Sequence, residues 1–459
     1  MIRPAAALSL IGFASLGLSV TAADAQELPH FAFVDANVVS MASRNILTDQ
    51  TVIVSAGRIA ATGNSSDIAV PVNAIVIDAE GRFLMPGLAE MHGHVPASDN
   101  IQYLEDVLFL YVANGVTTVR GMQGETGHLA LRDAIASHEI LGPRLMTSGP
   151  ALSGNSVSSP EEARQLVLTQ ASAGYDFVKL LRGLSRAEYD AAVEAGGEVG
   201  MALAGHVPED VGVGRALEAR QATIDHLDGY MQYLVPAEIS LSDNPAGFYG
   251  VNLLDLVDET RIAQAAIDTR EAGVWIVPTQ ALVEHIAMPN PTVEEQAASQ
   301  EVAYMPTRVV DGWIESRRRI YSGLREIPNG GRRLQNVRGR LIKAMHDAGV
   351  KLLLGSDAPQ IFSVPGFSLH QELELIVSAG LSPYEALRTG TFAPAEFFEM
   401  EEEFGDIRPG LAADFLMLDA NPLDNVAAAS HPQGVMVRGK WLDRAAIDAG
   451  LEAIASRYR

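Results

Sequence analysis

The sequence predicts an α/β fold: a (β/α)8 TIM barrel with a small β-sandwich domain formed by the N- and C-terminal segments. The 459 residues, 47% of them hydrophobic, suffice for one barrel and a smaller domain. Between residues 86 and 394, apolar runs alternate with amphipathic stretches, which is the pattern of repeated βα units. At both ends of the chain, short strand-like runs separated by Gly, Asn and Asp indicate a separate β unit.

Eight apolar runs in the central region predict the barrel strands. Several are largely apolar, as expected for strands buried on both faces. The runs cover residues 88–91, 115–120, 144–147, 177–181, 201–205, 222–225, 274–278 and 350–355. Two long connections, 229–273 and 280–349, are expected to form lids or substrate-binding elements. The second contains Arg317-Arg318-Arg319, which we interpret as a solvated helix face.

The two flanking segments suggest a division of the chain into three parts. Strand-like runs occur near the N-terminus at 31–34, 51–54, 58–60 and 74–77, and near the C-terminus at 415–418 and 434–437. We therefore predict a β-sandwich from residues 26–85 plus 395–445 and a catalytic barrel from residues 86–394.

The first 25 residues have the pattern of a secretory signal. Met1-Ile2-Arg3 precedes an apolar stretch over residues 4–20, and Ala23-Asp24-Ala25 supplies small residues for cleavage. The alternative is an uncleaved membrane anchor. With cleavage near Ala25, we expect an exported protein, periplasmic or secreted, that has no membrane association.

Composition excludes several classes of function. A net charge of -24 and a pI near 4.8 argue against nucleic acid as a partner, because phosphate binding needs clustered Lys and Arg. The chain has no cysteine, so thiolate nucleophiles, disulfides and Cys-ligated zinc are excluded. Any metal site must therefore use nitrogen and oxygen ligands. The expected partner is a small-molecule or short-peptide substrate, and a homo-oligomer remains open.

Five residues at the ends of predicted strands are candidate metal ligands. On a strand, the period of two sends His92 and His94 to the same side, so both imidazoles can meet one ion. His206, His226 and Asp357 each follow an apolar run. Because barrel sites are built where strands end, we expect these side chains to converge.

Three further residues are candidates with open alternatives. Lys179 lies inside an apolar run, where burial lowers the pKa of an amine. It is either a lysine that reacts with carbon dioxide to form a metal-bridging carbamate, or one paired with a carboxylate. Arg120 and Tyr230 lie at the ends of the second and sixth predicted strands and either bind a substrate carboxylate or oxyanion, or are structural.

This arrangement resembles the amidohydrolase superfamily, in particular its imidazolonepropionase-like and prolidase-like branch. The likeness covers nearly the whole mature chain, from the N-terminal β segment through residues 83–88 to the closing segment at 405–415, and it includes Ala-Gly-Tyr-Asp-Phe-Val-Lys at 173–179. The resemblance implies two divalent metal ions, a carboxylated lysine at Lys179, and the full ligand set His92, His94, Lys179, His206, His226 and Asp357. Two positions depart from the family. Gly93 is often larger in relatives, and Ser153-Gly154-Asn155 stands where peptidase-like relatives often carry a histidine.

The expected reaction is metal-assisted hydrolysis of an amide. Two ions, for which we expect zinc, would activate a water molecule and polarise the scissile carbonyl, and Asp357 would carry the proton to the leaving nitrogen. Short peptides or N-acyl amino acids are the first expected substrates, and cyclic amides, lactones or carbamates the second. The remaining alternatives are a one-metal, deaminase-like site with unmodified Lys179 and a catalytically silent solute-binding barrel.

Overall fold

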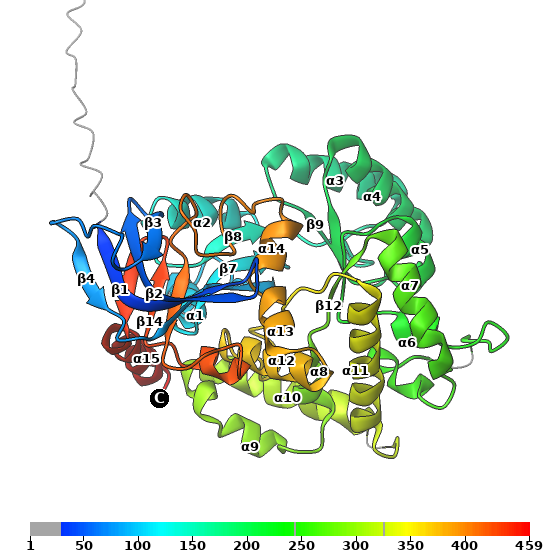
Figure 1. Cartoon of the computed structure of the whole chain (residues 1–459). Helices are drawn as coiled ribbons and strands as arrows, with labels where there is room; N and C mark the ends of the chain where they lie inside the picture. Colours follow the sequence, from blue (N-terminus) through cyan, green and yellow to red (C-terminus); the bar gives the residue numbers. More distant parts are fainter. Residues whose placement is uncertain (1–28, 243–244, 325) are drawn as a thin grey trace, which may run out of the picture.

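The computed structural model describes residues 29–242, 245–324 and 326–459 (Figure 1). The predicted signal peptide therefore lies outside the described residues. From residue 88 onward, short strands alternate with helices, as the sequence predicts. The strands are β6 (Leu88–Gly93), β7 (Val116–Gly121), β8 (Arg144–Thr147), β9 (Val178–Leu180), β10 (Leu203–Gly205), β11 (Thr223–Asp225) and β12 (Trp275–Val277).

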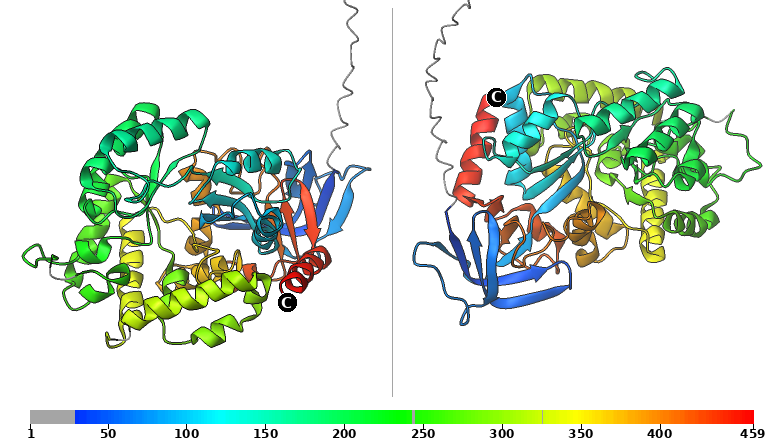
Figure 2. Two further views of the ribbon diagram at one scale, coloured as in Figure 1. Left: turned by 180° about the vertical axis from the view of Figure 1, so that it is seen from behind. Right: turned by 90° about the horizontal axis from the view of Figure 1, so that it is seen from above.

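Helices follow the strands and cover them from outside (Figures 1 and 2). The first seven of these helices are α1 (Ile101–Ala113), α2 (Gly127–Ala136), α3 (Pro160–Ala173), α4 (Arg186–Val199), α5 (Gly212–Glu218), α6 (Tyr230–Tyr233) and α7 (Ile262–Ala272). Local sequence sets their ends. The Ser185 side chain and Glu188 form a capping box at the start of α4, and Gly174 ends α3 in a left-handed conformation.

All the strands of this body are parallel. They form two ladders, β6-β7-β8 and β9-β10-β11-β12. A parallel bridge between Ser148 and Phe177 connects the end of β8 to the start of β9. The α/β class is thus confirmed, and the arrangement is TIM-barrel-like.

The eighth predicted strand forms isolated backbone contacts instead of a regular ladder. A parallel bridge joins Leu352 to Ile276 of β12, and the Met91 N–H of β6 donates to the Leu354 carbonyl at 2.8 Å. The Leu354 N–H donates instead to Thr389. Residues 350–355 therefore lie between β12 and β6 and bring the two ladders together.

The two ends of the chain pair in one sheet, ordered β15-β14-β13-β5-β1-β2-β3 with β4 beside β1 (Figure 1). Strand β5 (Phe83–Pro86) pairs antiparallel with β13 (Phe415–Leu418), so residues more than 300 positions apart are neighbours. The other strands are β1 (Phe31–Ser40), β2 (Asn45–Ser55), β3 (Arg58–Asn64), β4 (Ile75–Asp78), β14 (Gly434–Val437) and β15 (Lys440–Asp443). The strands from the two ends of the chain thus form one continuous sheet. The packing of two sheets as a β-sandwich, and the domain boundaries given from the sequence, stay predictions.

The second long connection is helical. It carries α8 (Gln280–Ala287), α9 (Val293–Ala297), α10 (Thr307–Leu324) and α11 (Gly330–Ala348). The interpretation of the arginine run as a solvated face is wrong for one member, because Arg317 is only 3% exposed while Arg318 and Arg319 are exposed.

The chain ends in the helices α12 (Phe367–Ser378), α13 (Pro383–Thr389), α14 (Phe392–Phe397) and α15 (Arg444–Tyr458). Within the described ranges, no helix is long and apolar enough to cross a membrane.

Candidate metal centre

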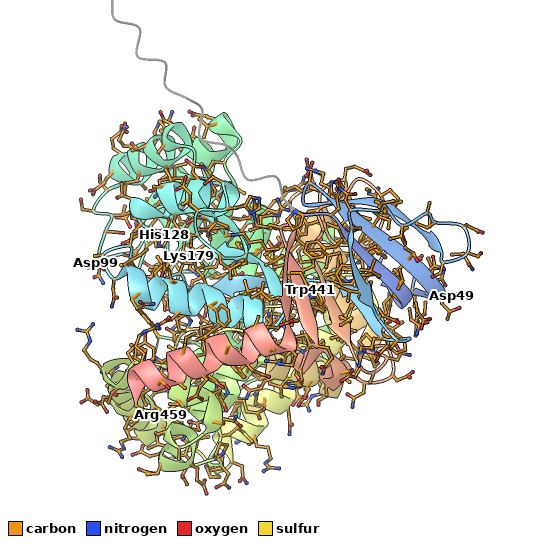
Figure 3. All side chains as sticks on the ribbon, turned by 90° about the vertical axis from the view of Figure 1, so that its left-hand side faces the viewer. Asp49, Asp99, His128, Lys179, Trp441 and Arg459 are labelled. Carbon is orange, nitrogen blue, oxygen red and sulfur yellow. The ribbon has the colours of Figure 1, made fainter. Side chains whose placement is uncertain are left out.

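The predicted ligands converge where the parallel strands end. His92 lies in β6, with His94 just after it, and Lys179 lies in β9. His206 and His226 directly follow β10 and β11, and Asp357 follows the extended segment 350–355. All except His226 line one cavity of about 480 Å³. Figure 3 places Lys179 in the strand-and-helix body, away from the sheet that carries Trp441 and Asp49.

The side chains are within reach of one another. The His94 Nε2 lies 2.6 Å from the Asp357 Oδ1, and the His92 Nε2 lies 3.6 Å from the same oxygen. The ring centroid of His226 lies 4.4 Å from that of His92 and 4.6 Å from that of His206. The structure thus brings together all six residues named from the sequence.

Each of three histidines is held through its Nδ1 by a neighbouring side chain. The His92 Nδ1 lies 2.8 Å from the Asp225 Oδ2, and the His206 Nδ1 lies 2.9 Å from the Asp228 Oδ2. The His226 Nδ1 lies 2.8 Å from the Thr279 Oγ1. The contacts of His206 and His226 are hydrogen bonds that fix each ring and its tautomer, so the Nε2 atom keeps a lone pair for a ligand bond. The His92 Nδ1 is close to Asp225 but is not aligned for a hydrogen bond, so this carboxylate acts on His92 through its charge and position.

The donor set fits a divalent metal ion. Ligand atoms of His92, His226 and Asp357 lie within 4.8 Å of one another, and the buried His226 Nε2 has no hydrogen-bond partner among the described residues. Burial lowers the pKa of His92 and His226 well below the usual value, with a smaller decrease for His206. The imidazoles are therefore neutral, which is the form that binds metals.

Lys179 is buried next to these histidines. Its Nζ lies 3.2 Å from the His92 Nε2, and the residue is 1% exposed. Burial lowers the pKa of Lys179 to about 8, although the charges of Asp225 and Asp357 oppose the decrease. The lysine passes close to Gly205, where a Cβ would lie 2.9 Å from the Lys179 Cδ and 2.5 Å from a backbone oxygen. A side chain at position 205 would therefore displace Lys179.

A buried carboxyl group joins the first and last parts of the site. The Glu90 Oε1 accepts hydrogen bonds from the backbone N–H groups of His92 and Ser356, each at 2.9 Å. Burial raises the pKa of Glu90 to about 7, and the Ser356 hydroxyl also donates to this carboxyl group. Gly93 leaves room for these contacts, because a Cβ there would lie 2.9 Å from Glu90. The missing side chain at position 93 is thus explained by packing.

Several residues of the site have a left-handed backbone conformation. His226 and Asp357 both have φ near 63°, and Thr279 has φ of 51°. Such values are uncommon for residues other than glycine and tend to occur at functional sites. The backbone thus orients two candidate ligands and the hydroxyl that holds one of them.

The structure does not support substrate contact by Arg120 or Tyr230. Arg120 is fully buried beneath the site, where its Nη2 lies 3.3 Å from the Asp225 Oδ2 and its Nε donates to the Met91 carbonyl. The Tyr230 hydroxyl is buried 2.6 Å from the Thr269 Oγ1. We correct both assignments, because neither side chain lines the cavity. Strand position alone did not reveal that neighbours direct these groups inward.

Two residues that line the cavity, Arg182 and Tyr249, are not among the site residues predicted from the sequence. Arg182 has a side chain that is 42% exposed, and its Nη2 lies 3.0 Å from the Asp228 Oδ1. Its guanidinium carbon lies 5.1 Å from the ring centroid of Tyr249. Arg182 follows β9 by two positions, a signal that could have identified it. Tyr249 comes from the long connection after β11, where no sequence pattern indicated the site.

Comparison with known proteins places the chain in a family. The profile described as "Amidohydrolase family" matches residues 83–442. The chain belongs to the amidohydrolase family. Among curated proteins, ochratoxinase from Aspergillus niger is 25% identical to this amidohydrolase over 381 residues, which cover 77% of this chain and 73% of the relative.

Solved structures share the fold of this amidohydrolase. A putative prolidase from Bifidobacterium longum has a TM-score of 0.67 at 24% identity and covers 93% of this chain and 99% of its own. Bottromycin amidohydrolase has a TM-score of 0.71 at 20% identity, and the match covers 95% of this chain and 92% of the bottromycin enzyme. Family membership supports a hydrolase that acts on carbon–nitrogen bonds.

Proposed function

We propose that this protein is an exported, metal-dependent amidohydrolase that cleaves the amide bond of short peptides or N-acyl amino acids. The observation that carries the proposal is the convergence of four imidazoles, a lysine and a carboxylate on one cavity end. Similar proteins include an ochratoxinase, a putative prolidase and a Xaa-Pro dipeptidase, and they support an amide as the substrate.

The residues that would hold two divalent ions are His92, His94, Lys179, His206, His226 and Asp357. Nitrogen and oxygen donors of this kind suit zinc. When bound, such ions lower the pKa of water and polarise a carbonyl oxygen. The outer contacts of Asp225, Asp228 and Thr279 keep the three imidazoles in one orientation.

Asp357 is the proposed proton carrier. One carboxylate oxygen is 2.6 Å from the His94 Nε2, and the other accepts a hydrogen bond from the Gln360 side chain at 2.8 Å. These contacts hold the carboxylate at the cavity wall, where it can take a proton from the attacking water and deliver it to the leaving nitrogen. Gln360 is therefore expected to orient the base, whereas the short distance between His94 and Asp357 fits two side chains that would share one metal ion.

Lys179 is proposed to be carboxylated in the active protein. With its pKa lowered to about 8, part of the amine is neutral near pH 7 and can react with carbon dioxide. The carbamate would add two oxygen donors next to His92. The distinguishing measurement is the ¹³C signal of protein equilibrated with labelled bicarbonate, since an unmodified lysine would indicate the one-metal alternative.

The cavity favours a small substrate with an apolar part and one carboxylate. Its apolar walls come from Leu181, Phe248, Leu282, Ile286, Ile320 and Ile361. Arg182 lines the same cavity with a partly exposed guanidinium that is suited to a terminal carboxylate. A volume of about 480 Å³ suits a dipeptide or an N-acyl amino acid rather than a long chain.

The test is a hydrolysis screen of dipeptides, N-acyl amino acids and lactones with zinc and bicarbonate present. We expect turnover of amides with an apolar acyl part and a free carboxylate, and a loss of about 10²–10⁴-fold in Asp357→Asn. Turnover of lactones alone would redirect the substrate assignment. If Asp357→Asn hydrolyses the substrate as fast as the wild type, this site is not where the reaction takes place. Export is tested separately, by N-terminal sequencing of protein recovered outside the cytoplasm.

A further inference from the structure

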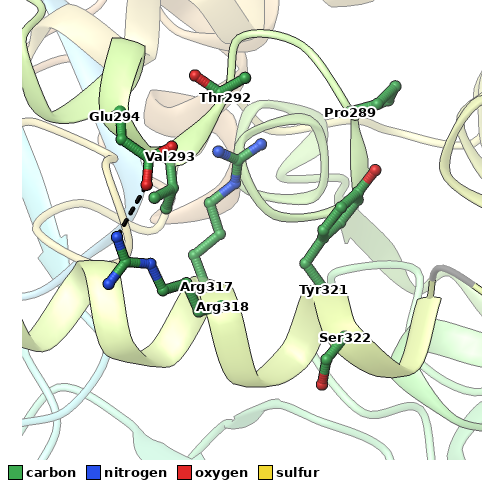
Figure 4. A pocket seen from close by; sticks show the side chains of 8 residues that line it. All are labelled: Pro289, Thr292, Val293, Glu294, Arg317, Arg318, Tyr321 and Ser322. Atoms are coloured by element: carbon green, nitrogen blue, oxygen red, sulfur yellow. Dashed lines mark hydrogen bonds and ion pairs between the residues drawn. The ribbon is translucent and has the colours of Figure 1, made fainter.

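A second cavity lies between α10 and the loop that precedes α9 (Figure 4). It has a volume of about 550 Å³, and none of its lining residues lines the catalytic cavity. Figure 4 shows the Arg317 side chain reaching from α10 toward the loop, with its guanidinium group between Val293 and Tyr321. The run of three arginines, whose pattern is typical of a solvated helix face, thus contributes one buried cation to a cavity.

Arg317 has no carboxylate partner among the described residues. Its Nη2 donates to the carbonyl groups of Met288 and Pro291, each at 2.8 Å. Its Nε is buried without a hydrogen-bond partner in the described part of the chain. The nearest acidic group in the cavity wall, Glu294, is already paired with Arg318 at 2.8 Å. The hydrogen bonds of this buried cation to the described residues therefore go to two backbone carbonyl groups and to no carboxylate.

This arrangement is unusual in an acidic protein. The chain has 57 Asp and Glu against 33 Lys and Arg, yet none of the described carboxylates forms an ion pair with Arg317. Burial of a guanidinium without a charged partner is costly, and burial lowers the pKa of Arg317 accordingly. A negatively charged ligand would offset this cost and provide bidentate acceptors for the guanidinium.

The walls indicate what else the ligand contains. Pro289 and Val293 provide apolar surface beside the guanidinium, and the Arg317 guanidinium carbon lies 5.8 Å from the ring centroid of Tyr321. An aromatic or branched apolar group can pack against these side chains while its carboxylate meets Arg317. Arg318, which is exposed, adds positive charge to the opening.

We propose that this cavity is a binding site for a small organic carboxylate, with the carboxylate on Arg317 and the apolar part against Pro289, Val293 and Tyr321. The site is separate from the metal centre and does not depend on the proposed reaction. The same helix, α10, carries Ile320 into the catalytic cavity, so α10 borders both cavities.

The test uses 4-iodobenzoate as the probe, because iodine can be located by anomalous scattering. Crystals of the protein soaked with the probe are expected to contain iodine between Val293 and Tyr321. Isothermal titration is expected to detect this site in the wild type and to find binding at least about tenfold weaker in Arg317→Gln. Val293→Trp, which fills the cavity but keeps Arg317, should abolish the same binding.

Arg319→Gln is the matched control, because Arg319 is exposed on the same helix and does not line the cavity. The affinity of Arg319→Gln for 4-iodobenzoate should equal that of the wild type. Probe bound in the catalytic cavity is distinguished by its position in the crystal. The proposal is overturned if soaked crystals contain no iodine in the α10 cavity, or if Val293→Trp binds the probe there as well as the wild type does.

Discussion

Asp225 contacts both a candidate metal ligand, His92, and a buried cation, Arg120. The substitution Asp225→Asn therefore tests whether this carboxylate contributes to metal affinity, to stability or to both. The Asp225 carboxylate lies 2.8 Å from the His92 Nδ1 and 3.3 Å from the Arg120 Nη2, and both acidic and basic side chains are fully buried. In Asp225→Asn, the buried Arg120 keeps its charge but loses its ion-pair partner, and Glu90 remains as a carboxyl group without a direct ion pair to it. Loss of one partner of a buried pair costs about 3–5 kcal/mol of unfolding free energy.

Asp228→Asn is the matched control. Asp228 holds the His206 Nδ1 at 2.9 Å, as Asp225 holds His92, but its ion-pair partner Arg182 has a side chain that is 42% exposed. A partly solvated pair of this kind contributes only about 0–1 kcal/mol. Both substitutions weaken a carboxylate-to-histidine contact, so we expect each to reduce metal affinity by about 10–100-fold. Only Asp225→Asn should also lose several kcal/mol of stability.

The assay is urea unfolding of metal-free protein, combined with metal titration against a competing chelator. A second change, Arg120→Met in the Asp225→Asn background, should recover part of the lost stability, because it removes the unpaired charge. The reasoning is refuted if the two single variants lose equal stability, or if Arg120→Met destabilises the Asp225→Asn protein further.

Three further predictions concern other residues. Arg182→Gln should raise KM by about tenfold or more for a substrate with a free carboxylate but leave KM nearly unchanged for its amidated analogue; equal effects on both would remove Arg182 from carboxylate binding. Lys179→Met should abolish the ¹³C carbamate signal and most turnover, and a signal that persists in this variant would assign the carbamate to another group. Burial lowers the pKa of His370 to about 4 from a usual 6.5. As pH falls, the unfolded chain therefore binds a proton at this histidine before the folded protein does. The free energy of unfolding that His370 contributes above pH 6.5 is thus lost toward pH 4. Between about pH 7 and about pH 4, the free energy of unfolding measured in urea should therefore fall by about 3 kcal/mol less in His370→Gln than in the wild type. The same pH dependence of this free energy in both proteins would contradict the prediction.

The ligand set could be predicted because period and position act locally. His92 lies in β6 with His94 just after it, Lys179 lies in the short strand β9, and His206, His226 and Asp357 follow a strand or extended segment, so parallel strands bring them to one end. Their convergence followed from elementary geometry together with the resemblance to a known family. The metal ligation itself stays a prediction.

Side-chain direction at strand ends could not be predicted in the same way. Arg120 and Tyr230 occupy positions that suit a site. However, the Arg120 guanidinium pairs with Asp225 and the Tyr230 hydroxyl contacts Thr269, both in the interior. These partners lie elsewhere in the sequence, so no local pattern reveals them. Arg317 illustrates the opposite error, since an arginine run resembles a solvated face although one member packs against backbone carbonyls.

The long connections carried little sequence signal. Tyr249, which contributes to the cavity wall, has φ of 46° in an irregular segment after β11, where neither a helical nor a strand period applies. The eighth strand was predicted at 350–355, and the segment is extended there, but its hydrogen bonds go partly to Thr389 instead of a neighbouring strand. Tertiary contacts decided both outcomes.

The most direct test of the central claim is a titration of metal-stripped protein with zinc, in which bound metal and amide turnover are measured in the same samples. We expect no turnover before zinc is added, a rise that follows occupancy, and a plateau once the site is filled. Full turnover in protein that contains no metal would contradict the claim that these six side chains act by holding metal ions.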